Sequence, residues 1–262
     1  MNRISLQIPG DEYGRKVDKG MALRFGSCTL RERGAGGKCA KFPVMILARK
    51  LSRIYSPTVR ALDGVDLEIQ RGEMVAVTGP SGCGKSTLLH LLGGLDRPTG
   101  GVLEVDGLAL ETAREAELTE YRRRTVGVVF QAFHLLPTMS VWENVSVPLL
   151  LRGVAQGEAR ARAERWVEWV GLWERRSHRI HELSGGQMQR TAVARALVHE
   201  PALLLADEPT GNLDSENARQ VVEVFQRIAS QLGTTMVVVT HSAEVADAAS
   251  RRIPLKDGRL VG

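Results

Sequence analysis

The sequence predicts an α/β fold built around a parallel sheet that is buried on both faces. Three observations support this prediction: short apolar runs alternate with helical periodicity, the inner runs are continuous and rich in valine or leucine, and one run leads through a glycine-rich loop into an apolar helix. Continuous apolar runs are typical of strands buried on both faces, whereas half-exposed strands alternate polar and apolar residues.

The expected elements follow this pattern in chain order. Apolar runs predict strands at Met74–Thr78, Val102–Val105, Val126–Phe130, Ala202–Ala206, Met236–Thr240 and Ile253–Leu255. Helical spacing predicts helices at Leu88–Leu92, Glu158–Gly171 and Gly185–His199.

The segment from Gln131 to about Leu197 has no strand signal and is predicted to be a helical insertion. Within it, Trp166, Trp169 and Trp173 recur at i, i+3 and i+7, which predicts that they share one helix face. Such a stripe is far more often part of a core than a ligand site, so we predict a core role.

The chain has 262 residues and a formal net charge of +5. Residues 1–44 account for all of this charge, because they contain nine Lys/Arg and four Asp/Glu. Residues 45–262 are therefore neutral overall, and the basic pI gives no reason to expect nucleic acid as a partner. Residues 1–44 lack periodicity and contain turn-forming runs, so we expect a mobile, disordered basic extension. Residues 45–262 are expected to form one large domain, with Met45 as a candidate translational start.

The longest apolar run, Phe42–Ala48, is far shorter than the roughly 20 residues that a membrane-spanning helix needs. It also lacks the features of a secretory signal, so we expect the protein to stay in the cytoplasm. Cys28, Cys39 and Cys83 form no metal-ligand spacing and are expected to be free thiols.

A glycine-rich loop separates the strand at Met74–Thr78 from the following helix. It matches the pattern G-x-x-x-x-G-K-[ST] and comprises Gly79, Pro80, Ser81, Gly82, Cys83, Gly84, Lys85, Ser86 and Thr87. Its glycines let the loop curl so that backbone N–H groups point at phosphate oxygens, and the helix adds its positive end. Lys85 is placed to neutralise β/γ-phosphate charge and Ser86 to ligate Mg²⁺. The alternative, a plain glycine-rich turn, does not account for the strand and helix on either side.

Two carboxylates follow the strand at Ala202–Ala206. Asp207 is placed to hold Mg²⁺ through water, and Glu208 to polarise an attacking water as general base. On their own, Asp207 and Glu208 would fit equally well as the solvent-exposed end of a strand before a turn at Pro209. Together with a phosphate loop, it predicts nucleotide hydrolysis.

A second glycine-containing run opens the helix predicted at Gly185–His199. It consists of Leu183, Ser184, Gly185, Gly186 and Gln187, and Ser184 is a candidate N-cap. A capped helix start also presents free N–H groups to an anion. The chemistry of this run alone does not identify whose phosphate it would meet.

With these motifs in this order, the chain resembles the ABC ATPase family from about Met45 to Gly262, and LSGGQ is the signature of that family. The resemblance implies a P-loop NTPase (RecA-like) core at 45–130 and 198–262, an inserted α-helical subdomain at 131–197 and an antiparallel β edge. It further implies that Met45–Leu51 is the first strand. It also implies ATP and Mg²⁺ held between two cassettes, so that Ser184 and Gly186 touch the γ-phosphate bound by the second copy.

Four further positions match the family pattern. Tyr55 resembles the aromatic that stacks on adenine, with an ordinary strand aromatic as the alternative. Gln131 resembles the Q-loop glutamine that senses Mg²⁺ and the transmembrane partner, and His241 resembles the switch histidine that contacts the γ-phosphate. Asp214 resembles the D-loop residue that communicates across the dimer.

Within the family, the stretches FQAFHLLPTMSVWENVSVPLLLRG and ADEPTGNLD resemble the branch of lipoprotein-releasing, macrolide-export and cell-division cassettes. Ile180 and Ser242 stand where that branch often has proline and aspartate, which weakens the subgroup assignment without touching a phosphate contact. The resemblance implies an ATP-hydrolysing subunit that drives export or membrane extraction through a separate transmembrane permease, at the inner face of the cell membrane.

The loop after Gln131 is unusually apolar, with Phe133, Leu135, Leu136, Pro137 and Met139. We predict that these residues form part of a groove for a cytoplasmic helix of the permease. Local packing beneath the helical insertion is an equal alternative.

Two other functions are alternatives to transport. A soluble ABC ATPase acting on DNA or ribosomes is disfavoured, because the chain has one cassette and no heptad run. A cell-division ATPase coupled to a membrane partner shares every motif described above.

Overall fold

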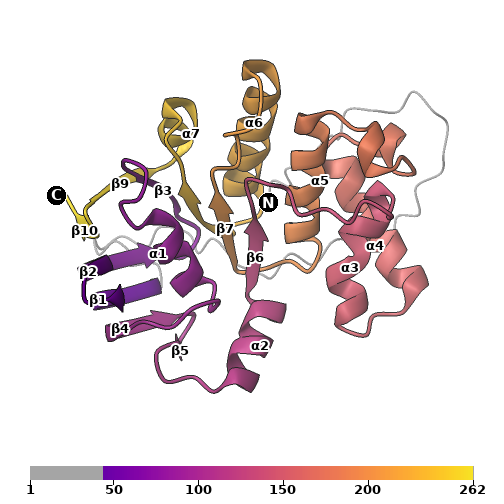
Figure 1. Ribbon diagram of the computed structural model, residues 1–262. Coiled ribbons are helices and arrows are strands. Elements are labelled where there is room, and N and C mark those ends of the chain that lie inside the picture. Colours follow the sequence, from indigo (N-terminus) through magenta and orange to yellow (C-terminus); the bar gives the residue numbers. More distant parts are fainter. Residues whose placement is uncertain (1–43, 262) are drawn as a thin grey trace, which may run out of the picture. The chain divides into compact units, whose positions relative to one another are not determined.

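The computed structural model describes residues 44–261, and their arrangement is shown in Figure 1. The predictions for Cys28, Cys39 and almost all of the N-terminal extension lie outside the described residues. Among the residues described, no helix is both long and apolar enough to cross a membrane.

The larger sheet has six strands in the order β10-β9-β3-β8-β7-β6. Neighbours from β9 to β6 pair in parallel, and β10 adds an antiparallel edge. The strands are β3 (Met74–Thr78), β6 (Val126–Val129), β7 (Leu203–Asp207), β8 (Thr235–Val239), β9 (Arg251–Lys256) and β10 (Arg259–Leu260). The predicted parallel sheet is therefore confirmed.

The smaller sheet is antiparallel, with four strands in the order β2-β1-β4-β5. It is formed by β1 (Val44–Ser56), β2 (Val59–Gln70), β4 (Gly100–Val105) and β5 (Leu108–Ala109). The strand predicted at Met45–Leu51 is the first half of β1, and β2 was not predicted. This sheet is the antiparallel β edge that the sequence resemblance implied.

Each face of the six-stranded sheet contributes to a different core. Val75, Leu205 and Val237 face a cluster that contains helix α1 (Lys85–Leu92) and the antiparallel sheet. Met74, Leu204 and their neighbours on the opposite face belong to a second cluster, formed with helices that follow β6 in the chain. Because successive side chains alternate between faces, burial on both sides requires the continuous apolar runs seen in the sequence.

Helices α3 (Val141–Leu151), α4 (Gln156–Trp169) and α5 (Gly185–Leu197) lie between β6 and β7 in the chain, together with two short 3₁₀ turns at Trp173–Arg175 and Ile180–Glu182. In the described residues, no strand is assigned between β6 and β7. The other helices are α2 (Glu115–Arg124), α6 (Ser215–Gln231) and α7 (Ala243–Ala248).

The prediction that Trp166, Trp169 and Trp173 share one helix face is wrong for Trp173. Helix α4 ends at Trp169, and Gly171 with a φ of 72° turns the chain so that Trp173 lies in the following 3₁₀ turn. Trp166 and Trp169 do pack, half-buried, against the core of the helical segment, with ring centroids 5.5 Å apart. Their predicted core role is therefore confirmed.

Candidate functional site

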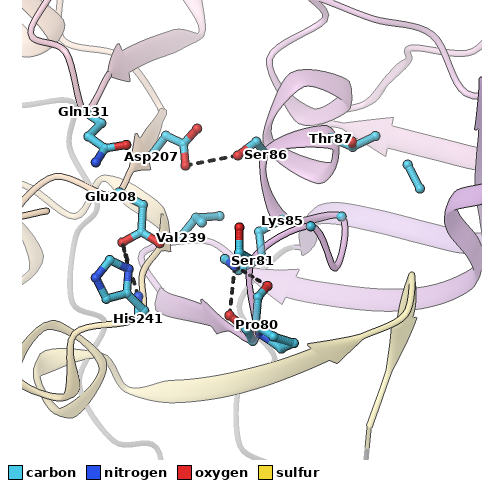
Figure 2. A pocket seen from close by; sticks show the side chains of 14 residues that line it. Pro80, Ser81, Lys85, Ser86, Thr87, Gln131, Asp207, Glu208, Val239 and His241 are labelled. Atoms are coloured by element: carbon cyan, nitrogen blue, oxygen red, sulfur yellow. Dashed lines mark hydrogen bonds and ion pairs between the residues drawn. The ribbon is translucent and has the colours of Figure 1, made fainter.

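A pocket of about 540 Å³ lies where the parallel strands β3, β7 and β8 end. Figure 2 shows the side chains that line it. They are Ala61, Gly79, Pro80, Ser81, Gly82, Gly84, Lys85, Ser86, Thr87, Gln131, Asp207, Glu208, Val239 and His241. Carboxyl ends of parallel strands are the usual place for a ligand in an open α/β sheet. The pocket thus brings together the predicted glycine-rich loop, both carboxylates, the glutamine and the histidine.

The glycine-rich loop runs directly from β3 into α1, and its shape depends on glycine. Gly84 immediately precedes α1 and has a φ of 106°. A Cβ added to Gly84 would lie 2.1 Å from the carbonyl oxygen of Ala61 in β2. Only glycine allows this backbone conformation at so close an approach, and α1 can then begin with its N–H groups beside the pocket.

The Lys85 ammonium lies inside this loop rather than in solvent. Its Nζ donates hydrogen bonds to the carbonyl oxygens of Gly79 at 2.8 Å and Pro80 at 2.9 Å. Lys85 is only 8% exposed, although it carries a charge. The lysine therefore places a positive charge where the loop curls, as phosphate binding requires.

Ser86 and Asp207 face each other across the pocket, as Figure 2 shows. Ser86 Oγ donates to Asp207 Oδ1 at 3.4 Å. Burial raises the pKa of Asp207; the Ser86 hydrogen bond lowers it, and the nearby negative charge of Glu208 raises it further. A hydroxyl and a carboxylate are hard oxygen ligands of the kind that Mg²⁺ prefers.

In the part of the chain that the structure describes, no group of three or more His, Cys, Asp or Glu could hold a metal ion. An ion between Ser86 and Asp207 would therefore need further oxygen ligands from water or a bound phosphate. Magnesium sites that use one or two protein ligands and substrate phosphates have this character.

The side chains of Glu208 and His241 are in direct contact in the pocket. His241 Nδ1 lies 2.9 Å from Glu208 Oε2, and the backbone N–H of His241 donates to the same oxygen at 3.2 Å. Glu208 has a φ of 44°, in the left-handed region that residues other than glycine seldom adopt. Its N–H donates to the carbonyl oxygen of Val239 at 2.9 Å, which attaches the strained residue to the end of β8.

Gln131 enters the pocket two residues after β6 and is held by a residue that we did not predict. Its Nε2 donates to Asn212 Oδ1 at 3.3 Å, and Asn212 Nδ2 donates to the carbonyl oxygen of Gln131 at 3.1 Å. Asn212 lies two residues before Asp214, the position that the resemblance matched to the D-loop. This amide pair connects the glutamine loop to the segment after β7.

The signature run and Asp214 lie outside the pocket lining of their own chain. Ser184 caps α5, as predicted: its Oγ accepts a hydrogen bond from the Gln187 N–H at 3.3 Å, and Gln187 Oε1 accepts one from the Ser184 N–H at 3.0 Å. Asp214 caps α6 by accepting the Asn217 N–H at 2.9 Å. The backbone and side-chain hydrogen bonds from Asn217 lower the pKa of Asp214.

Tyr55 and Cys83 also do not line the pocket. The Tyr55 hydroxyl donates to Asp96 Oδ2 at 2.9 Å, and the Arg53 guanidinium lies 4.5 Å from its ring centroid. Tyr55 is 52% exposed, whereas Cys83 is 4% exposed, with its Sγ 3.9 Å from Lys85 Nζ. An adenine contact at Tyr55 stays a prediction.

Comparison with protein families gives one match to this region. A family model described as ABC transporter matches residues 62–211. The matched range contains the glycine-rich loop, Gln131, the LSGGQ run and both carboxylates. It does not extend to Tyr55, Asp214 or His241.

Curated proteins of similar sequence cover most of the chain. It is 45% identical over 213 residues to the uncharacterized ABC transporter ATP-binding protein YknY of Bacillus subtilis (strain 168), an alignment that covers 81% of this chain and 92% of that protein. It is 46% identical over 217 residues to the lipoprotein-releasing system ATP-binding protein LolD of Bordetella avium (strain 197N), with 82% and 94% covered.

Solved structures share the fold. One is the dimeric post-hydrolysis state of the ATP-binding cassette MJ0796 bound to ADP and Pi, with a TM-score of 0.77, 38% identity and 83% and 97% of the two chains covered. Another is cbiO1 from Clostridium perfringens, described as part of the ABC transporter complex cbiONQ, with a TM-score of 0.77, 29% identity and 84% and 87% covered. The predicted fold class is confirmed by these matches.

Proposed function

Since this chain belongs to the ABC transporter family as an ATP-binding subunit that hydrolyses ATP, we propose that two copies close around ATP and Mg²⁺ and thereby drive a separate membrane permease. The observation that carries this proposal is the pocket itself. It places Lys85, the Ser86–Asp207 pair and the Glu208–His241 pair around one cavity, although they come from three separate segments of the chain.

The pocket supplies the parts that phosphoryl transfer to water needs. Lys85 and the N–H groups at the start of α1 stabilise the phosphate charge. Glu208 accepts a proton from a water as the water oxygen bonds to the γ-phosphorus, and the bond from that phosphorus to the ADP oxygen breaks. His241 holds the carboxylate of Glu208 in place. We also assign its imidazole to the γ-phosphate. The products are ADP and inorganic phosphate.

Magnesium fits the same site. Ser86 and Asp207 are the residues that would hold it, with Gln131 at the pocket wall as a third oxygen ligand. When bound, the ion neutralises charge on the β- and γ-phosphate oxygens.

The signature run supports a two-copy site. Ser184 caps a helix whose free N–H groups suit an anion, yet none of the five signature residues lines the pocket of its own chain. We therefore assign Ser184 and Gly186 to the γ-phosphate bound by the second copy. The MJ0796 cassette is dimeric with ADP and Pi bound, which agrees with this arrangement.

A permease-binding surface is supported by the loop after Gln131. Leu136 is 41% exposed and Pro137 is also exposed, whereas Phe133, Leu135 and Met139 are half-buried, so the loop combines local packing with an open apolar surface. Arg195 of α5 donates to the carbonyl oxygen of Phe133 at 2.7 Å. Movement of this loop would therefore act directly on the signature helix.

We propose that the motor acts at the inner face of the cell membrane, where its permease holds it, and that the cargo is exported or extracted from the membrane. The 46% identity to a lipoprotein-releasing ATP-binding protein favours this class of transport.

The test is the Glu208→Gln variant. The amide keeps the size of the side chain and the contacts of the phosphate loop but cannot accept the proton, so ATP should bind while turnover falls by about 100-fold or more. An ATP-dependent dimer should then accumulate in size-exclusion chromatography with Mg²⁺. Near wild-type turnover would contradict the base role of Glu208, and a chain that stays monomeric would contradict the two-copy site.

A further inference from the structure

The signature run and the D-loop lie at the starts of two neighbouring helices. Ser184 caps α5 and Asp214 caps α6, and these helices pack against each other. Their starts are in contact, because a Cβ on Gly185 would lie 3.2 Å from Leu213 Cδ2.

One side chain, Asn217, links these two helix starts. Its backbone N–H donates to Asp214 Oδ1 at 2.9 Å, and its Nδ2 donates to Asp214 Oδ2 at 2.7 Å. Against α5, a Cβ added to Gly186 would lie 2.0 Å from Asn217 Oδ1 and 2.7 Å from Asn217 Cβ. The asparagine therefore occupies the space that the missing side chain of Gly186 leaves open.

The orientation of the Asn217 amide is determined by chemistry. The Asp214 carboxylate only accepts hydrogen bonds when ionised, so the NH₂ group of Asn217 must face it and the amide oxygen must face Gly186. About one helical turn further along, Arg190 of α5 donates a hydrogen bond to Gln220 of α6. The starts of α5 and α6 cannot shift independently without breaking this series of contacts.

We propose that Asn217 is a positioning residue that holds the signature run of one copy in the orientation in which it meets the nucleotide of the second copy, and that it links this orientation to Asp214. The role rests on the proposed ATP-dependent dimer. Asn217 does not line the nucleotide pocket of its own chain. Its loss should therefore weaken association of the two copies without weakening nucleotide binding by one copy.

The first experiment uses the full-length chain with Glu208→Gln, which slows hydrolysis. In this background, Asn217→Ala removes the amide, and the dissociation constant of the ATP-bound dimer should rise by about tenfold, as expected for the loss of a hydrogen bond to a charged group. It is measured by analytical ultracentrifugation, and affinity for a fluorescent ATP analogue is measured on the monomer. That affinity should change by less than about twofold. Arg219→Ala, an exposed position on the same helix, is the control that should leave both constants unchanged.

An Asn217→Ala dimer as tight as its parent would overturn the positioning role. Equal losses of dimerisation and of nucleotide affinity by the monomer would also overturn it, because they would place Asn217 in its own nucleotide site. A Glu208→Gln parent that stays monomeric with ATP would overturn the two-copy site itself, and this role with it.

The second experiment tests the contact between Gly186 and Asn217 directly. Gly186→Ala should weaken the dimer, whereas Gly157→Ala should not, because a Cβ at Gly157 meets nothing within 4 Å. In a double-mutant cycle, the effect of Gly186→Ala should largely disappear when residue 217 is changed by Asn217→Gly, since the clashing atoms are then gone. Strictly additive effects of the two changes would show that Gly186 and Asn217 act separately and would overturn the proposal.

Discussion

His241 holds the carboxylate of Glu208 through two atoms: its Nδ1 lies 2.9 Å from Glu208 Oε2, and its backbone N–H lies 3.2 Å from the same oxygen. The ring contact depends on the side chain, whereas the backbone contact does not. Glu208 is mostly buried and His241 is 68% exposed, so the imidazole can be removed without opening a core.

We therefore expect His241→Ala to lower kcat for ATP by about 100-fold, because the general base loses its orienting partner. The KM for ATP should change little, since Lys85 and the phosphate loop are untouched. Steady-state ATPase kinetics check this prediction, with Ser242→Ala as the neighbouring control. A rise in KM at constant kcat would instead assign His241 to nucleotide binding.

The approach of Gly84 to β2 leads to a second prediction. Gly84→Ala should weaken ATP binding by about tenfold or more, because the added Cβ meets the Ala61 carbonyl oxygen and the loop must move away from its phosphate-binding shape. Gly107→Ala is a matched control: Gly107 also has a positive φ, of 79°, but its Cβ would meet nothing within 4 Å. The affinity of both variants for a fluorescent ATP analogue is measured. Equal losses of affinity would contradict the prediction, because they would not depend on the contact between the added Cβ and Ala61.

Most of the sheet was predictable because buried parallel strands are continuous apolar runs. Strand β2 was not predicted because it contains no continuous apolar run: its buried Val65, Leu67 and Ile69 alternate with exposed or half-buried polar residues. The alternation is the normal signal of a half-exposed antiparallel strand, and it was present in the sequence. Helix α6 was also missed, although its buried Val221, Val222, Phe225 and Ile228 have clear helical spacing.

The pocket was predictable where a residue's role follows from its neighbours in the chain. Gly79–Thr87 and Asp207–Glu208 belong to this class, since each follows a strand that ends at the same sheet edge. Contacts across the sheet could not be predicted in this way. The pairing of Glu208 with His241 depends on β7 lying beside β8, and the pairing of Gln131 with Asn212 depends on β6 lying beside β7.

The raised pKa of Asp207 leads to a third prediction, on stability. A carboxyl whose pKa is raised by burial binds its proton more tightly in the folded chain than in the unfolded chain. The free energy of unfolding therefore falls as pH rises from the ordinary aspartate pKa through the raised value, and the loss persists at neutral pH. Asp207→Asn removes this charge and its amide oxygen can still accept the Ser86 hydroxyl.

Without nucleotide, we expect Asp207→Asn to raise the Tm at pH 7 by about 2–4 °C relative to wild type. The difference should shrink as the pH falls toward the ordinary aspartate pKa, because the carboxyl of the folded wild-type chain takes up its proton before that of the unfolded chain does. Thermal melts across this pH range test the direction of the difference in Tm and the pH range over which that difference changes. An Asp207→Asn chain that melts below wild type at pH 7 would contradict the prediction. ATPase activity should fall in the same variant, because Asp207 is a proposed Mg²⁺ ligand.

The last prediction concerns Cys83, which lies in the phosphate loop but beneath its surface. Its side chain is 4% exposed, and its Sγ is 3.9 Å from Lys85 Nζ and close to Gly79. A maleimide can reach this sulfur only when the loop opens, so modification should be slow in the native chain. Bound ATP should slow it further, because phosphate contacts stabilise the closed loop. Once formed, the adduct should abolish ATP binding, since the loop cannot close over the added group.

Cys83→Ser separates this site from Cys28 and Cys39. The hydroxyl is small enough to fit beneath the loop, so this variant should keep ATPase activity within about threefold of wild type and should resist inactivation by N-ethylmaleimide. Mass spectrometry of the labelled peptides gives the rate at each cysteine with and without ATP. Protection by ATP at Cys83 alone is the expected result. Two results would show that the loop does not close over phosphate as its geometry indicates. One is inactivation of Cys83→Ser at the wild-type rate, and the other is a rate of Cys83 labelling that is the same with and without ATP.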